Sequence, residues 1–212
     1  MYICNSKKSI DMFLNENLFI DFLSQRDILW TGINFSKAKL TKQGFDFPQD
    51  VLQYYFNGWN SSIINNQKKF DIRLSFQKPI MHYDLAMVTK MNKSTKASHL
   101  LTNVIAHQDI LNETQVCSYV TENCTIESET PYALTFLVEY LDSIAKRASI
   151  WVVLYKTSTG EVALAEDFLL KPSGFGTNNY WGRTFYNLLF DIKTSAFIRW
   201  KNLVQGQIGN GQ

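Results

Sequence analysis

The sequence lacks an excess of either charge. Its 212 residues include 21 Lys and Arg and 19 Asp and Glu, which leaves a formal net charge of +2. So small a charge produces no strong field over the surface, and electrostatic attraction alone would not gather a polyanion. We therefore expect no nucleic acid among the partners of this protein.

Long apolar runs are also missing. The most apolar stretch, YALTFLVEYL at 132–141, has about half the length of a membrane-spanning helix and contains Glu139. We therefore predict no transmembrane helix. Near the N-terminus, Asp11, Asn15 and Glu16 interrupt the apolar residues, whereas a signal peptide has a continuous apolar segment of about 7–15 residues. We expect a cytoplasmic protein, or one of the cell envelope if the N-terminus is truncated.

Cysteine and histidine are scarce, with 3 residues of each. On a helix, the spacing of Cys117 and Cys124 corresponds to about 10 Å, which is too far for a disulfide. Together with Cys4 they make an odd number, so we expect three reduced thiols. The histidines follow no zinc-binding spacing such as H-E-x-x-H, and we predict neither a metal site nor a cofactor.

The composition is that of a globular protein. Hydrophobic residues make up 45% of the chain and aromatic residues 14%, enough for one substantial core. No internal repeat and no low-complexity linker divides the sequence. We expect a single domain over 1–212, with flexible ends at 1–10 and 206–212, where GQIGNGQ forms a polar, glycine-rich tail.

Apolar residues recur at helical spacing in several segments of the first 130 residues. This spacing predicts a helix over 11–25 and a second helix after Pro48 with an aromatic face. A third helix begins near Asn112, where Gln115 completes the pattern of a capping box. Bulky and β-branched residues at 28–35 predict the first strand of a sheet.

The segment IMHYDLAMVTKMN, at 80–92, alternates in the way that is typical of a sheet strand. In a strand, His82 and Asp84 would point to the same face about 7 Å apart. We interpret them as neighbours at the surface. The alternative is a general base with the carboxylate that orients it.

Three β-rich runs follow one another in the C-terminal half, at 132–141, 148–156 and 161–170. TSTG, between the second run and the third, contains the glycine that a short hairpin loop needs. This pattern predicts an antiparallel meander. Both faces of the first two runs are largely apolar, so the sheet should be covered on both sides over much of its area, with helices or a partner supplying the second layer. The fold class that we predict is α+β, a mixed sheet covered by helices.

The corner KPSGFGTNNYW, at 171–181, joins the last predicted strand to a helix over 178–192, and a further amphipathic stretch ends near Val204. It differs from a dinucleotide fingerprint, because Asn179 stands at the third glycine position and the preceding strand is antiparallel. In our interpretation Gly174 and Gly176 provide unusual backbone angles and Thr177 or Asn178 caps the helix.

Three functions are compatible with the sequence. The chain shows no combination of nucleophile, base and acid and is rich in aromatic residues, which favours a non-catalytic protein-interaction or assembly module with a protein partner. The alternative is a small-ligand or nucleotide-binding protein that uses the corner. Its candidate binding residues are Gly174, Gly176, Asn178, Asn179 and Arg183. A third hypothesis is a hydrolase built on Asp84, Glu139, Glu166 and Asp167.

Five segments carry a resemblance. The patterns LWTGINFSKAKL, YYFNGWN, YDLAMV, VEYLDSIAKRASIWVVLY and GFGTNNYW resemble an uncharacterised family of small Bacteroidota proteins. The resemblance covers most of the chain beyond residue 27 and implies no particular activity. Exported members would begin with a signal peptide, which this sequence does not show. The order of elements is also similar to α/β domains of the curli-secretion and TolB N-terminal kind, which suggests a module that docks on other proteins.

Overall fold

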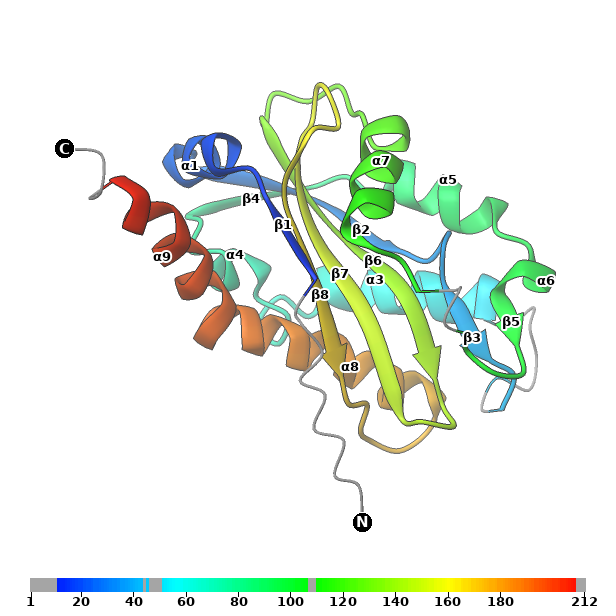
Figure 1. Ribbon diagram of the computed structural model, residues 1–212. Helices are drawn as coiled ribbons and strands as arrows, with labels where there is room; N and C mark the ends of the chain where they lie inside the picture. Colours follow the sequence, from blue (N-terminus) through cyan, green and yellow to red (C-terminus); the bar gives the residue numbers. More distant parts are fainter. Residues whose placement is uncertain (1–10, 44, 46–50, 107–109, 209–212) are drawn as a thin grey trace, which may run out of the picture.

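The computed structural model describes residues 11–43, 45, 51–106 and 110–208 (Figure 1). An eight-stranded mixed sheet runs through its centre, which confirms the predicted α+β class. The strand order is β1 (Met12–Leu14), β8 (Val162–Leu170), β7 (Arg147–Lys156), β6 (Tyr132–Asp142), β2 (Asp27–Asn34) and β4 (Ile80–Tyr83), while β3 (Lys39–Thr41) pairs with β6 and β5 (Leu101–Thr102).

The antiparallel meander predicted from the three β-rich runs is confirmed. β6 pairs with β7, and β7 with β8, so that Val152 lies between Phe136 on one side and Glu166 on the other. Gly160 in the turn before β8 has a φ of +71°, the conformation that glycine adopts without strain. β2 lies parallel to β6, which makes the sheet mixed.

Helices cover both faces of the sheet (Figure 1). Side chains from both faces of β6 are buried, as expected for a sheet with two covered sides. One face carries α1 (Glu16–Ser24), α3 (Phe56–Asn65), α4 (Ile72–Ser75), α8 (Thr177–Asp191) and α9 (Phe197–Ile208); the other carries α5 (Ala86–Ser94) and α7 (Glu113–Asn123). The short α6 (Ala97–Leu100) lies beside β3 and β5.

Two π-helical segments extend these helices. η1 (Val51–Tyr55) leads into α3, and η3 (Ile192–Ala196) joins α8 to α9 in one helical run. The run continues to Ile208, so the tail that we expected to be flexible from 206 begins as helix. Residues 1–10 and 209–212, and with them Cys4, lie outside the described residues. No helix within the described ranges is long and apolar enough to cross a membrane.

The strand predicted over 80–92 is wrong beyond Tyr83. β4 ends there, and α5 begins at Ala86, whose N–H donates to the Asp84 carboxylate at 2.9 Å. The sequence does alternate between apolar and polar residues, as a strand would. However, Leu85 and Val88 are three residues apart, a spacing that also fits one face of a helix. α5 packs on β2, and this tertiary contact selects the helix.

Beyond the end of β4, two asparagine side chains form hydrogen bonds with the edge of β2. The ladder between β2 and β4 ends at Trp30 and Tyr83. Beyond it, the Asn60 amide of α3 accepts from the Ile33 N–H at 2.7 Å and donates to the Ile33 carbonyl at 3.1 Å. Asn92 of α5 accepts from the Phe35 N–H at 2.7 Å and donates to the same Ile33 carbonyl at 2.9 Å.

Gly32 makes this arrangement possible. The register between β2 and β6 shifts at this point, and Gly32 has a φ of +111°. A Cβ atom here would lie only 2.8 Å from the Asn60 side-chain oxygen and 2.9 Å from Leu85. Any larger residue would strain the backbone and push α3 and α5 away from the strand.

Lys78 secures the end of α1. Its side chain is buried, and its ammonium donates to the carbonyls of Phe22 at 2.6 Å and Gln25 at 2.8 Å. The Phe22 carbonyl also accepts from the N–H of Gln25, the residue just beyond the helix, at 3.0 Å. Both carbonyls lie at the C-terminal end of α1, where a cation is favourable. Burial lowers the pKa of Lys78 to about 8, an effect that the nearby Asp27 opposes.

The asparagine contacts generate a first prediction. Asn60→Ala and Asn92→Ala should each lower the free energy of unfolding by about 1–3 kcal/mol, because a buried backbone N–H of Ile33 or Phe35 loses its side-chain partner. Asn65→Ala, an exposed change at the end of α3, should lower it by less than about 0.5 kcal/mol. Urea denaturation measures all three. Equal losses in all three variants would contradict the role assigned to the edge amides.

Lys78 should make stability depend on pH in a defined direction. The unfolded chain keeps a pKa near 10.5 and the folded chain one of about 8, so the unfolded state binds more protons between these values. The contribution of Lys78 to stability therefore rises with pH across this window, by at most about 1.4 kcal/mol per pH unit. The difference in unfolding free energy between the wild type and Lys78→Met should grow from pH 8 to 10.5. A constant difference would contradict this assignment.

Candidate functional site

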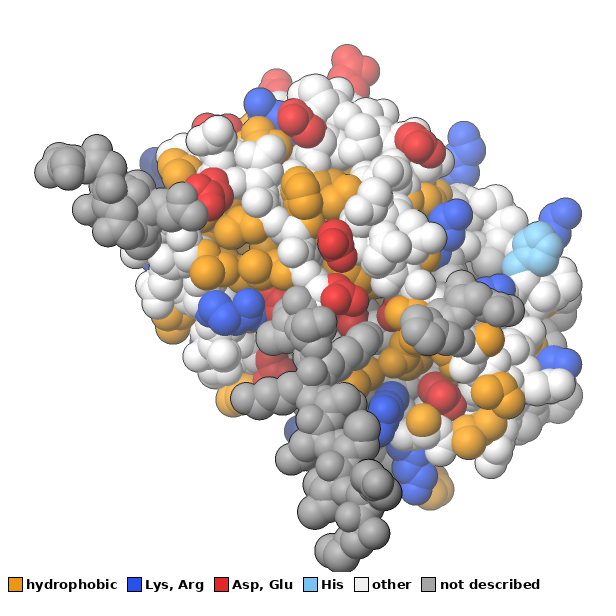
Figure 2. Space-filling model, in the orientation of Figure 1, with side chains coloured by type: hydrophobic (Ala, Val, Ile, Leu, Met, Phe, Trp, Pro, Cys, Tyr) orange, Lys and Arg blue, Asp and Glu red, His pale blue; other side chains and the backbone are white. Residues whose placement is uncertain are grey.

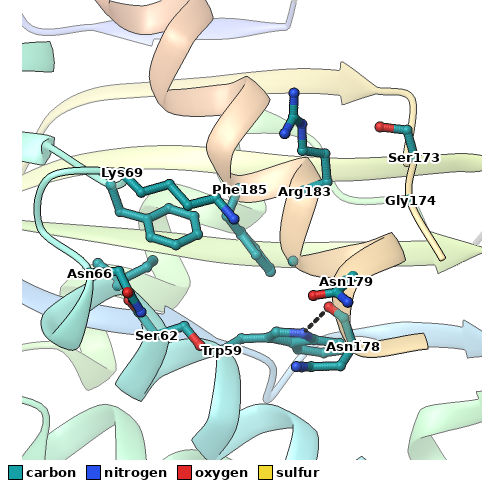
Figure 3. A pocket seen from close by; sticks show the side chains of 13 residues that line it. Trp59, Ser62, Asn66, Lys69, Ser173, Gly174, Asn178, Asn179, Arg183 and Phe185 are labelled. Atoms are coloured by element: carbon teal, nitrogen blue, oxygen red, sulfur yellow. Dashed lines mark hydrogen bonds between the residues drawn. The ribbon is translucent and has the colours of Figure 1, made fainter. Parts of the chain in front are cut away.

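A pocket of about 370 Å³ opens between α3 and the start of α8 (Figure 3). The end of α3 and the loop that follows it form one wall, and the corner after β8 and the first turns of α8 form the other. Its polar lining residues are Ser62, Asn66, Lys69, Ser173, Asn178, Asn179 and Arg183, and its apolar ones include Trp59, Ile63, Phe70 and Phe185.

The structure brings most of the residues proposed for the corner to this pocket. Gly174, Asn178, Asn179 and Arg183 line it, and Gly176 precedes the helix just outside it. Both glycines have positive φ, +120° at Gly174 and +75° at Gly176, as the interpretation of the corner required. The sequence pattern therefore identified one wall of a pocket.

The predicted cap of α8 is wrong. Gly176 itself is the N-cap residue, and neither Thr177 nor Asn178 provides a side-chain hydrogen bond to the first turn. The glycine reaches the required backbone angles at no steric cost, so the chain enters the helix without a polar cap. The carbonyl of Asn178 instead accepts a hydrogen bond from the Trp59 indole at 3.0 Å, which ties the start of α8 to α3 (Figure 3).

Among the described residues, two cations and no carboxylate line the pocket. The Lys69 ammonium lies 5.2 Å from the centre of the Phe70 ring, and the Arg183 guanidinium 4.7 Å from that of Tyr186. Both side chains are exposed, and within the described part of the chain neither forms an ion pair. The positive charge of the pocket is therefore uncompensated locally and complements an anionic group.

The opposite face has a different charge distribution. In the view of Figure 2, acidic and basic side chains are interspersed over the surface around α5 and α7.

Sequence reasoning missed Lys69, which belongs to the run NNQKKF after α3. The two lysines of that run indicate local positive charge, but only the fold places Lys69 across the pocket from Arg183.

The acidic residues of the hydrolase hypothesis do not line the pocket. Glu166 is buried and accepts from the Arg199 guanidinium at 2.6 Å and from the Trp200 indole at 2.5 Å. Both partners belong to α9, so this carboxylate fixes α9 on β8. Asp167, the next residue, points to the other face of the sheet and accepts from the Ser149 hydroxyl.

The two remaining carboxylates also make backbone or helix contacts. Asp84 accepts from the first turn of α5, as described above. Glu139 is buried and accepts from the Leu111 N–H. The four residues thus stand at separate structural positions instead of converging on the pocket.

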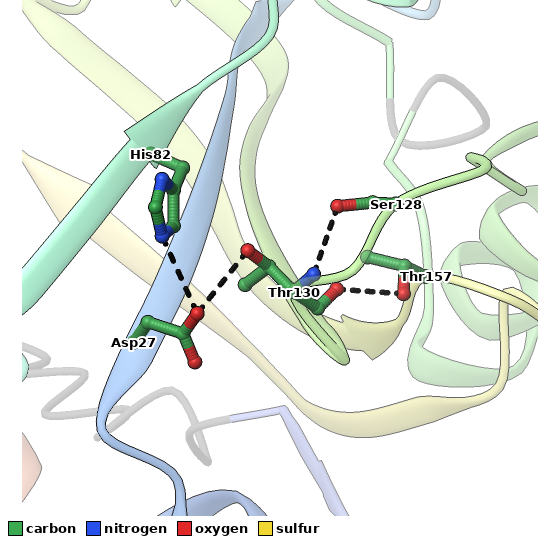
Figure 4. Close-up of polar contacts among 5 residues, drawn as sticks. All are labelled: Asp27, His82, Ser128, Thr130 and Thr157. Atoms are coloured by element: carbon green, nitrogen blue, oxygen red, sulfur yellow. Dashed lines mark hydrogen bonds and ion pairs between the residues drawn. The ribbon is translucent and has the colours of Figure 1, made fainter.

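His82 pairs with a carboxylate other than the one considered from the sequence. Its Nε2 lies 3.3 Å from the Asp27 carboxylate, and the Thr130 hydroxyl donates to the same oxygen at 3.3 Å (Figure 4). Thr157 donates to the Thr130 carbonyl at 2.9 Å. Among the described residues no hydroxyl or thiol contacts the second nitrogen of His82, so no nucleophile is placed beside it. The contacts of His82, Asp27 and Thr130 join β4, β2 and the loop before β6.

Cys117 and Cys124 are both free thiols, as expected. Burial raises the pKa of Cys117 to about 11 and that of Cys124 to about 12, which keeps both in the unreactive thiol form. Within the ranges that the structure describes, no three side chains of the His, Cys, Asp and Glu types lie close enough together to hold a metal ion.

No family model, no curated protein and no solved structure matches this chain. The resemblance to a Bacteroidota family and the likeness to curli-secretion and TolB N-terminal domains therefore stay predictions. The pocket and its charges are the observations on which a function can be argued.

The corner generates a third prediction. Gly176→Val should lower the free energy of unfolding by about 1–2 kcal/mol, because its positive φ is costly for a β-branched residue. No atom lies within 4 Å of the position of the new Cβ, so this loss measures the backbone alone. Arg183→Ala should change stability by less than about 0.5 kcal/mol. Chemical denaturation that gives the reverse order would contradict the separation of structural and binding roles.

Proposed function

We propose that the protein is a non-catalytic binding module that holds an anionic group in the pocket at the Gly174–Asn179 corner. The observation that carries the proposal is the placement of Lys69 and Arg183 in a concave, partly polar site whose described lining residues include no acidic one. An anion that enters the pocket gains charge-assisted hydrogen bonds from both cations.

The lining residues suit recognition of oxygen atoms. The Arg183 guanidinium can bind a carboxylate or phosphate through two parallel hydrogen bonds, while Lys69 acts as a point charge. The Asn66 amide on one wall, and the Asn179 amide and Ser173 hydroxyl on the other, offer further donors. The apolar lining residues Trp59, Ile63, Phe70 and Phe185 lie beside these donors.

The lining supports binding in preference to catalysis. Ser62 and Ser173 are the only hydroxyl side chains among the described lining residues, and no histidine or carboxylate lines the pocket to activate them. The buried Glu166 is occupied by the contacts that hold α9.

A protein is the partner that we favour. Phe175 lies between the two glycines of the corner, next to the pocket, and its side chain is 95% exposed. An aromatic residue in such a position can anchor a protein interface by burying its ring on association. The assembly module expected from the sequence would then bind an acidic side chain in the pocket and an apolar patch on Phe175.

A free small molecule is the second candidate, and the size of the pocket favours it. A cavity of about 370 Å³ lies within the range of small-ligand sites. A nucleotide would place its phosphates at Lys69 and Arg183. This alternative predicts a rise in melting temperature with ATP that Arg183→Ala abolishes, because a ligand at 100 times its dissociation constant adds about 2.7 kcal/mol of stability.

The proposed function is tested by titrating the ¹⁵N-labelled protein with citrate and inorganic phosphate. Chemical-shift changes should concentrate at Lys69 and over 178–183, with dissociation constants on the order of millimolar that weaken as salt is added. The double variant Lys69→Gln and Arg183→Gln should weaken binding about tenfold or more, since both cations are lost.

Lys90→Gln is the matched control. Lys90 is an exposed lysine of α5 on the other face of the sheet, so its replacement should leave the titration unchanged. Shifts spread evenly over the surface, or equal weakening by Lys90→Gln and by the double variant, would refute the proposal.

A further inference from the structure

The exposed side of α8 continues the character of the pocket. Beyond Arg183, the helical run presents Tyr186, Phe190 and Lys193 at intervals of three or four residues, which places them on one face. A second hollow of about 170 Å³ lies between these three residues and the segment 68–75. Lys69 lines both hollows, so they adjoin each other at this side chain, and we call the two together the groove along α8.

Positive charge extends through this groove. Arg183 lines the first hollow, Lys69 stands where the two hollows meet, and Lys68 and Lys193 line the second. Asp71 is the one acidic residue among the described residues that line the two hollows. Its carboxylate accepts from the Leu74 N–H at 2.8 Å and lies 3.7 Å from the Arg73 guanidinium.

Exposed apolar surface lies between the cations. Phe190 is 55% exposed and Leu74 is 46% exposed, and both line the second hollow. The edge of the Tyr186 ring adds to this surface, although Arg183 covers one of its faces. The groove thus alternates cationic and apolar contacts along its length.

The length of the groove exceeds that of a small anion. From Asn179 to Lys193 the helical rise amounts to about 21 Å. An extended peptide covers this distance with about six or seven residues. A single phosphate or carboxylate would fill the end at Arg183 and leave Phe190 and Lys193 unused.

We propose that the groove binds an extended acidic segment of a protein partner. One carboxylate of the segment lies at Lys69 and Arg183, another lies at Lys193, and an apolar side chain between them packs on Phe190 and Leu74. This inference rests on the proposed function and specifies its partner. A protein segment is favoured over a single-stranded nucleic acid, because Asp71 lies within the groove and the chain carries a net charge of only +2.

The test uses a fluorescein-labelled peptide of about seven residues that alternates pairs of Glu with single Phe, and fluorescence anisotropy of the full chain. We expect saturable binding that is at least tenfold tighter than that of inorganic phosphate. Lys193→Gln and Phe190→Ser should each weaken it about fivefold or more, while Lys90→Gln leaves it within about twofold. The same peptide with Gln in place of Glu should lose binding.

Phosphate titrations separate this inference from the proposed function. Lys193→Gln and Phe190→Ser should leave phosphate binding at the corner unchanged, whereas Arg183→Gln weakens both ligands. If phosphate binds at the corner but the peptide binds no more tightly and ignores Lys193, the inference is overturned and the proposed function stands. If neither binds, both are overturned.

Two further outcomes are decisive. An oligouridylate that binds more tightly than the acidic peptide, with the same dependence on Lys193, would overturn the proposal in favour of single-stranded nucleic acid.

Circular dichroism and a urea midpoint close to that of the wild type establish that each variant is folded. Loss of peptide binding in Phe190→Ser with an unchanged midpoint supports the proposal, because Phe190 is exposed and lies outside the core.

Discussion

The pairing of the β2 edge with two side-chain amides is the constraint on which the architecture depends. β4 covers only the first half of β2, and Asn60 and Asn92 supply the hydrogen bonds that a longer strand would have made. Because one amide comes from α3 and the other from α5, the same backbone segment positions a helix on each face of the sheet. The neighbour of Asn60, Trp59, then fixes the start of α8 through Asn178. The position of the pocket follows from this chain of contacts.

Buried charges in this protein hold helices in place. Glu166 receives hydrogen bonds from two residues of α9, and Lys78 binds the carbonyls at the end of α1. A buried charge is costly unless its partners satisfy it, and here the partners come from elements that must stay together. Lys69 and Arg183 of the groove differ, because they lie over aromatic rings, form no ion pair among the described residues and remain exposed to a ligand.

The meander and the corner could be predicted from the sequence because their signals are local. Runs of β-branched and aromatic residues with a glycine in the turn determine strands, and closely spaced glycines mark a turn with unusual backbone angles. The segment after Tyr83 could not be assigned in the same way, since its apolar spacing fits a strand and a helix and the contact of α5 with β2 decides. Lys69 was missed because it meets Arg183 only in the fold. For the same reason, no property of the sequence around Asn60 and Asn92 indicates that they bind one carbonyl.

The π-helical segment η3 makes the number of residues in the last helical run as important as their identity. Before it, Phe185 packs on Trp59 of α3 and Trp181 stacks on Phe45, and after it Phe197 and Trp200 pack against Phe19 of α1. Each residue added to or removed from a helix rotates everything beyond it by about 100°. A deletion within Ile192–Ala196 would therefore turn the buried side of α9 outward and separate Trp200 from Glu166, although every side chain involved in those contacts would still be present.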